Sequence, residues 1–156
     1  MIANFNHYLE RGHVKKRTPD PEEAKSLLKK AETRLNYFKS KEITEEDDSI
    51  IFENIYGSIR EAAQSLMSIK GYKPYSHEAT ISFLKEFYKN NFTEEEINKF
   101  DGFRSLRSDS EYRAIHVSKE DAESCLTFAE TFIEKIKSIY DALSKLQLNK
   151  NNKEGL

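Results

Sequence analysis

The spacing of apolar residues constrains the fold of this chain most, because it repeats at three and four residues over long stretches. It is most regular in segment 45–70, at Ile51, Ile55, Ile59, Ala62, Ala63, Leu66 and Met67. Such spacing places the apolar side chains on one face of an α-helix. Five glycines and three prolines in 156 residues are too few for an all-β chain, which needs turn residues roughly every eight to twelve positions. We therefore predict an all-α fold.

Four further segments show the helical spacing, at 21–38, 76–88, 93–106 and 118–143. A residue suited to capping a helix stands at the start of each segment or directly before it, and these residues are Asp20, Ser76, Thr93 and Ser118. Thr44 and Asp47 resemble a capping box for the helix predicted from about Glu45. Short links between such helices favour an up-and-down antiparallel bundle of about five helices.

The domain organisation follows from the same pattern. We expect an N-terminal arm over residues 1–18, a helical-bundle domain over 19–148 and a frayed tail over 149–156. Phe5, Tyr8 and Leu9 of the arm could dock on the bundle.

Charge and cysteine content narrow the class of protein. The net charge of −2 does not by itself indicate a nucleic-acid or membrane surface. No apolar run approaches the ~20 residues of a membrane span, and no secretory leader is visible, so we expect a cytoplasmic protein with no membrane partner. The single cysteine excludes an internal disulfide, and the four scattered histidines do not indicate a metal site. Catalytic and cofactor motifs are missing, so we expect neither cofactor nor metal.

The segment 103–116 is the candidate functional region, because it is rich in arginine and interrupts the apolar pattern. Arginine offers a planar fork that suits phosphate or carboxylate. The candidate binding residues here are Arg104, Arg107, Asp109, Tyr112, Arg113 and His116. The alternative is a polar helix end that is stabilised by pairs between its own arginines and acidic residues.

Four stretches, 24–34, 52–63, 71–77 and 103–112, carry a family resemblance through their order and spacing. With them the chain resembles the HEPN family, and it is most similar to a group of archaeal HEPN-like proteins. The resemblance implies a helical bundle that often dimerises and a link to RNA or nucleotides. Many members are metal-independent ribonucleases with an arginine, four to six residues and then a histidine. Others partner a nucleotidyltransferase in toxin–antitoxin pairs or bind RNA or ligands without catalysis.

This sequence departs from the nuclease motif. Four residues separate Arg107 from Tyr112, which occupies the place of the motif's histidine, and eight residues separate Arg107 from His116. Tyrosine, with a pKa near 10, is a poor general base. We therefore predict a non-catalytic module that binds RNA, a nucleotide or a protein partner through its arginines. The resemblance also implies that the chain forms a homodimer.

Two alternatives remain open. One is a metal-independent endoribonuclease that uses Arg107 with Tyr112 or His116, and the other is the partner subunit of a nucleotidyltransferase. The matched stretches also supply secondary candidate residues, and these are Asn54, Tyr56, Arg60 and His77.

Overall fold

The computed structural model describes residues 1–155, which form six helices and one two-stranded antiparallel sheet. In chain order the elements are α1 (Phe5–Glu10), β1 (Val14–Lys16), α2 (Pro21–Lys39), α3 (Asp48–Lys70), β2 (Tyr72–Pro74), α4 (His77–Phe87), α5 (Glu94–Arg113) and α6 (Lys119–Glu154). The prediction of an all-α bundle is confirmed, and α2 to α6 are the five helices that the apolar spacing predicted.

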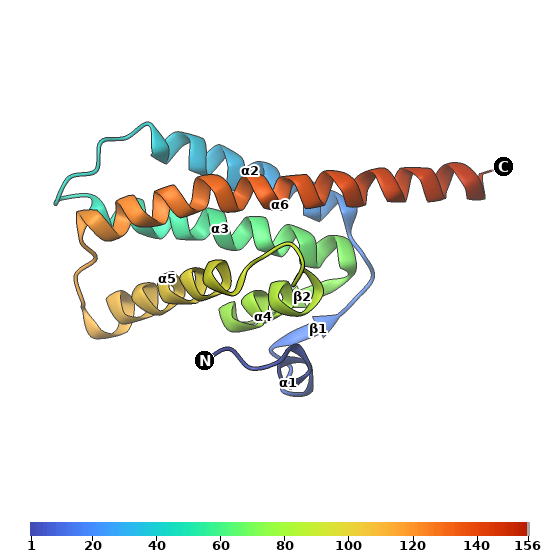
Figure 1. Ribbon diagram of the computed structural model, residues 1–156, viewed down its shortest axis with the longest axis horizontal. Coiled ribbons are helices and arrows are strands. Elements are labelled where there is room, and N and C mark those ends of the chain that lie inside the picture. Colours follow the sequence, from blue (N-terminus) through green and yellow to red (C-terminus); the bar gives the residue numbers. More distant parts are fainter. Residues whose placement is uncertain (156) are drawn as a thin grey trace.

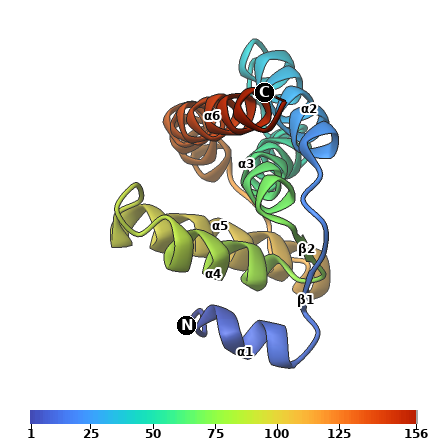
Figure 2. The ribbon, with the colours of Figure 1, turned by 90° about the vertical axis from the view of Figure 1, so that its right-hand side faces the viewer.

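Helix α3 lies at the centre of the molecule. Seen along the bundle, α2 and α6 lie on one side of it, α4 and α5 lie on the other, and α1 lies outside α4 (Figure 2). The chain reverses direction between α2 and α3, whereas α6 runs in the same direction as α3 (Figure 1). The intervening α4 and α5 carry the chain back to the end of the bundle where α3 begins.

The central position of α3 explains why it is buried almost all round. Its apolar stripe is in the core, with Ile55 and Ile59 fully buried. Tyr56 and Ser58, which lie to the sides of that stripe, are buried as well. A helix with neighbours on two faces is expected to bury more than one stripe, and this is how Tyr56 comes to lie beneath α4 and α5.

The predicted helix starts are confirmed for α2, α4, α5 and α6. Asp20 and Ser76 accept hydrogen bonds from backbone amides three residues later, at 2.9 and 3.1 Å. Thr93 and Ser118 each form a complete capping box. Such caps satisfy amide groups that have no partner within the helix.

The predicted start of α3 was wrong by three residues. Asp47 accepts a hydrogen bond from the backbone amide of Thr44 at 2.8 Å, which is one half of the expected capping box. The residues between them form a turn, however, and the helix begins only at Asp48. The Thr44–Asp47 pair therefore closes a turn that precedes the helix.

The N-terminal residues contain two elements that the periodicity did not indicate. Helix α1 places Phe5 and Tyr8 in the core, against α4. Strand β1 pairs with β2 in antiparallel register, so that Lys15 lies opposite Lys73. At the other end, α6 extends to Glu154 through most of the segment predicted as a tail, and the last residue of that segment, Leu156, lies outside the described residues.

Candidate functional site

A small cavity opens between the start of α4 and the second half of α5. Its volume is about 250 Å³, and its lining residues are Ser76, His77, Glu78, Arg104, Arg107, Ser108 and Tyr112. Ser76 caps α4 and fixes the position of the residues that follow it. The cavity thus combines the first turn of α4 with arginines that lie on one face of α5.

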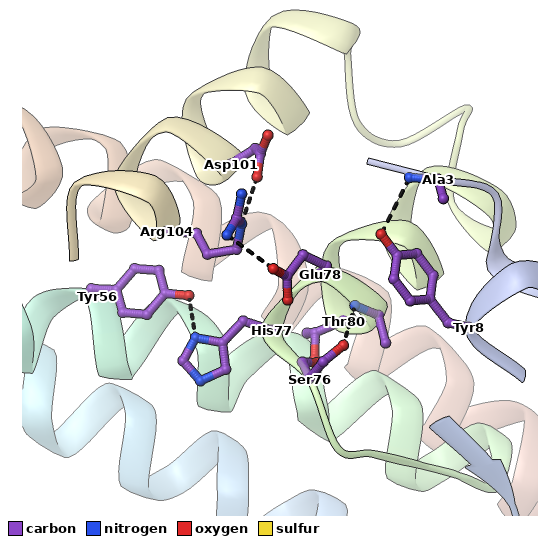
Figure 3. Close-up of polar contacts among 10 residues, drawn as sticks. Ala3, Tyr8, Tyr56, Ser76, His77, Glu78, Thr80, Asp101 and Arg104 are labelled. Carbon is purple, nitrogen blue, oxygen red and sulfur yellow. Dashed lines mark hydrogen bonds and ion pairs between the residues drawn. The ribbon is translucent and has the colours of Figure 1, made fainter. Parts of the chain in front are cut away.

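His77 lines the cavity and is bonded to Tyr56 of α3. The Tyr56 hydroxyl and Nδ1 of His77 are 2.9 Å apart and form a hydrogen bond, and the ring centroids are 5.7 Å apart (Figure 3). Tyr56 is 1% exposed, so its ring is held by the core of the bundle. The bond links α3 to the first residue of α4 and leaves Nε2 of His77 without a hydrogen bond to residues 1–155.

The surroundings keep both groups of the pair neutral. Burial, and to a smaller extent the positive charges of Arg60 and Arg107, together lower the pKa of His77 to about 4, against the opposing effect of Glu78. Burial also raises the pKa of Tyr56 well above its usual value, although the same two arginines oppose this shift. At neutral pH the imidazole is therefore uncharged and the phenol retains its proton.

Arg104 is held in place by two carboxylates. Its Nε donates to Asp101 on the preceding turn of α5 at 2.6 Å, and one terminal nitrogen donates to Glu78 of α4 at 3.1 Å (Figure 3). Burial alone would lower the pKa of Arg104, but its bonds to Asp101 and the charges of both carboxylates raise it. Arg104 therefore fastens α5 to α4 and closes one side of the cavity.

Arg107 is paired with a single carboxylate of its own helix. Its two terminal nitrogens lie 3.1 and 2.7 Å from the two carboxylate oxygens of Glu111, one turn further along α5. Its guanidinium carbon is 5.8 Å from the centre of the Tyr56 ring, which is within cation–π range. The guanidinium of Arg107 therefore lies over the ring of Tyr56, which is bonded to His77.

Arg60 follows Tyr56 by one turn of α3. It forms no ion pair with any of residues 1–155. Its charge nevertheless acts on both Tyr56 and His77, since it lowers the pKa of each. Arg60 is thus a guanidinium near the cavity whose charge is not balanced by a paired carboxylate.

The predicted site residues are divided between this cavity and other places. Those brought together are Tyr56, His77, Arg104, Arg107 and Tyr112, with Arg60 close by. The others do not line the cavity. Asp109 and Arg113 pair with each other at 3.7 Å, His116 lies 3.2 Å from the buried Asp48, and the Asn54 amide bonds to the carbonyl of Ile50.

Four residues of the site were not among the predicted site residues. Ser76, Glu78 and Ser108 line the cavity, and Asp101 holds Arg104. The spacing of three residues between Asp101 and Arg104 is a detectable signal, because residues three apart are neighbours on a helix. No comparable signal exists for Glu78, which meets Arg104 only through the packing of α4 against α5.

Among residues 1–155, no group of three or more histidine, cysteine, aspartate or glutamate side chains could hold a metal ion. None of the described helices combines the length and the apolar character required to cross a bilayer.

Comparison with known proteins places this geometry in a family context. The family model described as "HEPN domain" matches residues 9–139. The match includes every residue that lines the cavity and all helices from α2 to α5. No curated protein matches the sequence of the chain.

Proposed function

The chain belongs to the HEPN domain family, and we propose that it binds a phosphate group of RNA or of a nucleotide in the cavity between α4 and α5. The observation that carries this proposal is the grouping of Arg107 and Arg60 around a neutral His77. Guanidinium groups bind phosphate through paired hydrogen bonds.

Arg107 can exchange its present partner for a phosphate at little cost. Its bond with Glu111 is an i,i+4 pair on a helix surface, and both side chains are about one-third exposed. Such pairs contribute only about 0.3–0.5 kcal/mol. Arg104 differs, because its two carboxylate partners lie on two elements, and we assign it a positioning role.

His77 adds a neutral hydrogen-bonding group to the charged ones. When the Tyr56 hydroxyl donates to Nδ1, the proton of the imidazole is on Nε2 and can be donated to a phosphate oxygen. A bound phosphate also favours the imidazolium form, since a negative charge nearby raises a histidine pKa. Binding is therefore expected to raise the pKa of His77 from about 4.

The first experiment compares two arginines of the same helix. Fluorescence anisotropy with a 5′-labelled, unstructured RNA gives the Kd of wild-type protein, Arg107→Ala and Arg113→Ala. Both arginines pair with an acidic residue four positions away, but only Arg107 lines the cavity. Loss of a charged hydrogen bond costs about 1.5–3 kcal/mol, so Arg107→Ala is expected to weaken binding about 10-fold or more. Equal effects of the two variants would contradict the proposal.

A second experiment looks for a gain of affinity. Glu111→Gln frees Arg107 from its carboxylate, whereas the control, Asp109→Asn, frees Arg113 outside the cavity. Both variants change the net charge by the same amount, so non-specific attraction of RNA is matched. Glu111→Gln is expected to tighten binding about twofold relative to Asp109→Asn, from the cost of the broken pair. Weaker binding by Glu111→Gln would mean that the phosphate does not meet Arg107.

A metal-independent endoribonuclease is the second candidate function. It is favoured by one observation, the presence of a neutral histidine beside Arg107. If Nδ1 of His77 donates to the Tyr56 oxygen, Nε2 is left free to accept a proton from a ribose hydroxyl. This candidate predicts cleavage of single-stranded RNA in EDTA, lost in His77→Ala and kept in a His116→Ala control. Binding without cleavage between pH 4 and pH 9 would exclude it.

The assembly of the protein is a separate proposal. HEPN domains commonly dimerise, and we propose a homodimer for this chain, to be checked by analytical ultracentrifugation. A nucleotidyltransferase partner in a toxin–antitoxin pair is a further proposal from the family resemblance, and co-purification with the product of the adjacent gene would test it. The cytoplasmic location expected from the sequence remains a prediction.

A further inference from the structure

The two-stranded sheet presents a basic and aromatic surface to solvent. Lys15 and Lys73 lie opposite each other in the register of β1 and β2, so both side chains are on the same face. Tyr75, two residues beyond Lys73, lies under both of them, with ammonium nitrogens 5.4 and 5.9 Å from the centre of its ring. These three residues are called the ribbon patch. All three are exposed, and Tyr75 retains 57% of its accessible surface.

The opposite face of the same sheet is fastened to the bundle. Val14 is buried, and Tyr72 packs edge-on against Phe5 at a centroid distance of 5.2 Å. The backbone amide of Tyr75 donates to the carbonyl of His13 at 2.7 Å, just beyond the paired residues. The ribbon patch is therefore a supported surface, and an aromatic ring that is already positioned loses little freedom when a ligand stacks on it.

The ribbon patch adjoins the cavity along the chain. Tyr75 is followed directly by Ser76 and His77, which line the cavity. Because one residue spans at most ~3.6 Å, the Cα atoms of Tyr75 and His77 are no more than about 7 Å apart. The backbone of Tyr75 thus lies directly beside residues that line the cavity, and a ligand that extends beyond the cavity along this part of the chain meets the ribbon patch next.

We infer that the ribbon patch is a second subsite that binds the neighbouring nucleotide of a single-stranded RNA, with its base stacked on Tyr75 and its phosphates near Lys15 and Lys73. An exposed aromatic ring beside cations is the combination by which proteins hold single strands. The inference rests on the proposed phosphate site and adds the class of ligand: a strand of two or more nucleotides, in preference to a free mononucleotide.

Another tyrosine of the chain provides a matched control. Tyr37 on α2 is 58% exposed and has the ammonium group of Lys41 4.5 Å from its ring centre. It resembles Tyr75 in exposure and in its cationic neighbour, but it lies on α2, which lines no part of the cavity. A general attraction of RNA to exposed tyrosine–lysine pairs would affect both positions equally.

The experiment measures two ligands against the same variants. An eight-nucleotide oligouridylate is titrated by anisotropy, and uridine monophosphate by isothermal calorimetry. Tyr75→Ala is expected to weaken oligouridylate binding about 10-fold, the scale of one lost stacking contact, and to leave the affinity for the mononucleotide unchanged. Tyr75→Phe and Tyr37→Ala are expected to bind both ligands as the wild type does. A circular dichroism melt of each variant verifies that it is folded.

Salt dependence tests the two lysines. The Lys15→Ala/Lys73→Ala double variant removes two phosphate contacts, so the slope of log K against log salt is expected to become shallower by about 1.4. An unchanged slope would show that Lys15 and Lys73 do not contact the phosphates of the strand. Oligouridylate and mononucleotide affinities that are equal in the wild-type protein would overturn the inference as a whole.

The outcome also separates this inference from the proposed function. If Arg107→Ala weakens the binding of both ligands while Tyr75→Ala weakens the binding of neither, the phosphate site stands and the ribbon patch is refuted as a subsite. If Arg107→Ala changes the affinity for neither ligand, the phosphate site is refuted. The role of the ribbon patch as a second subsite is then refuted as well, because it depends on that site.

Discussion

The hydrogen bond between Tyr56 and His77 supports the first prediction, which concerns stability and uses a second buried tyrosine as its reference. Tyr56 and Tyr88 are both buried, at 1% and 7% exposure. Their hydroxyl groups differ: the Tyr56 hydroxyl is bonded to Nδ1 of His77, whereas the Tyr88 hydroxyl has no partner among residues 1–155. Replacing each by phenylalanine removes a hydroxyl oxygen, which is hydrogen-bonded in Tyr56 and unbonded in Tyr88.

The expected magnitudes have opposite signs. Tyr56→Phe loses a hydrogen bond with a net value of about 1 kcal/mol and leaves Nδ1 of the half-buried His77 without its partner, so the free energy of unfolding is expected to fall by roughly 1–2 kcal/mol. Tyr88→Phe removes a polar group that is buried at a cost of about 1–3 kcal/mol. Its free energy of unfolding is expected to stay the same or to rise by up to roughly 1 kcal/mol.

Urea denaturation followed by far-ultraviolet circular dichroism measures both variants. Thermal melts should agree, with a Tm lower by roughly 2–8 °C for Tyr56→Phe, since about 1 kcal/mol corresponds to about 2–4 °C in a protein of this size. If the two variants lose the same amount of stability, the hydrogen bond between Tyr56 and His77 does not stabilise the fold, and the reasoning is refuted.

Two further predictions concern the pH dependence of His77 and the backbone at Gly71. His77 is expected to titrate near pH 4 in an NMR experiment. Because this pKa is below the value of about 6.5 in the unfolded chain, the unfolded state binds more protons between about pH 4 and about pH 6.5. The free energy of unfolding should therefore fall as the pH drops from about 6.5 to 4. Gly71 has a φ of +86°, and a Cβ there would meet the carbonyl oxygen of Arg17, so Gly71→Ala is expected to cost about 1–2 kcal/mol in urea denaturation. Gly102→Ala is the control, since a Cβ in that helix has no atom within 4 Å and alanine is expected to stabilise it by up to about 1 kcal/mol.

The fold could be predicted where packing repeats along the chain. The apolar spacing of α3 and the caps at Thr93 and Ser118 are local patterns, and they were sufficient to identify five helices and most of their starts. The strands β1 and β2 have three residues each, which is too short for an alternating pattern to be recognised. Their pairing also joins residues nearly sixty positions apart, and no local signal carries that information.

The candidate site was predictable only in part for the same reason. Segment 103–116 was singled out by its arginines, and Arg104 and Arg107 do line the cavity. Asp109 and Arg113 share the segment but not the cavity, because the direction of a helical side chain depends on its position in the turn. His116 follows the end of α5 at Arg113 and lies beside Asp48 instead. Arg113 and Asp109 instead pair with each other, which is the local pairing of arginine and acid that was the alternative interpretation of the segment.

The histidine of the site illustrates how far a spacing motif can be trusted. A fixed spacing of arginine and histidine on one helix is a means of placing an imidazole beside a guanidinium. Here Tyr112, which follows Arg107 at that spacing, is 83% exposed, while the imidazole beside Arg107 is that of His77, from the start of α4. The Tyr56 ring connects them, since it contacts the guanidinium at 5.8 Å and bonds to the imidazole at 2.9 Å. Absence of the helical motif therefore does not remove histidine from the arginine site of this protein, and assays for binding or cleavage should be directed at His77.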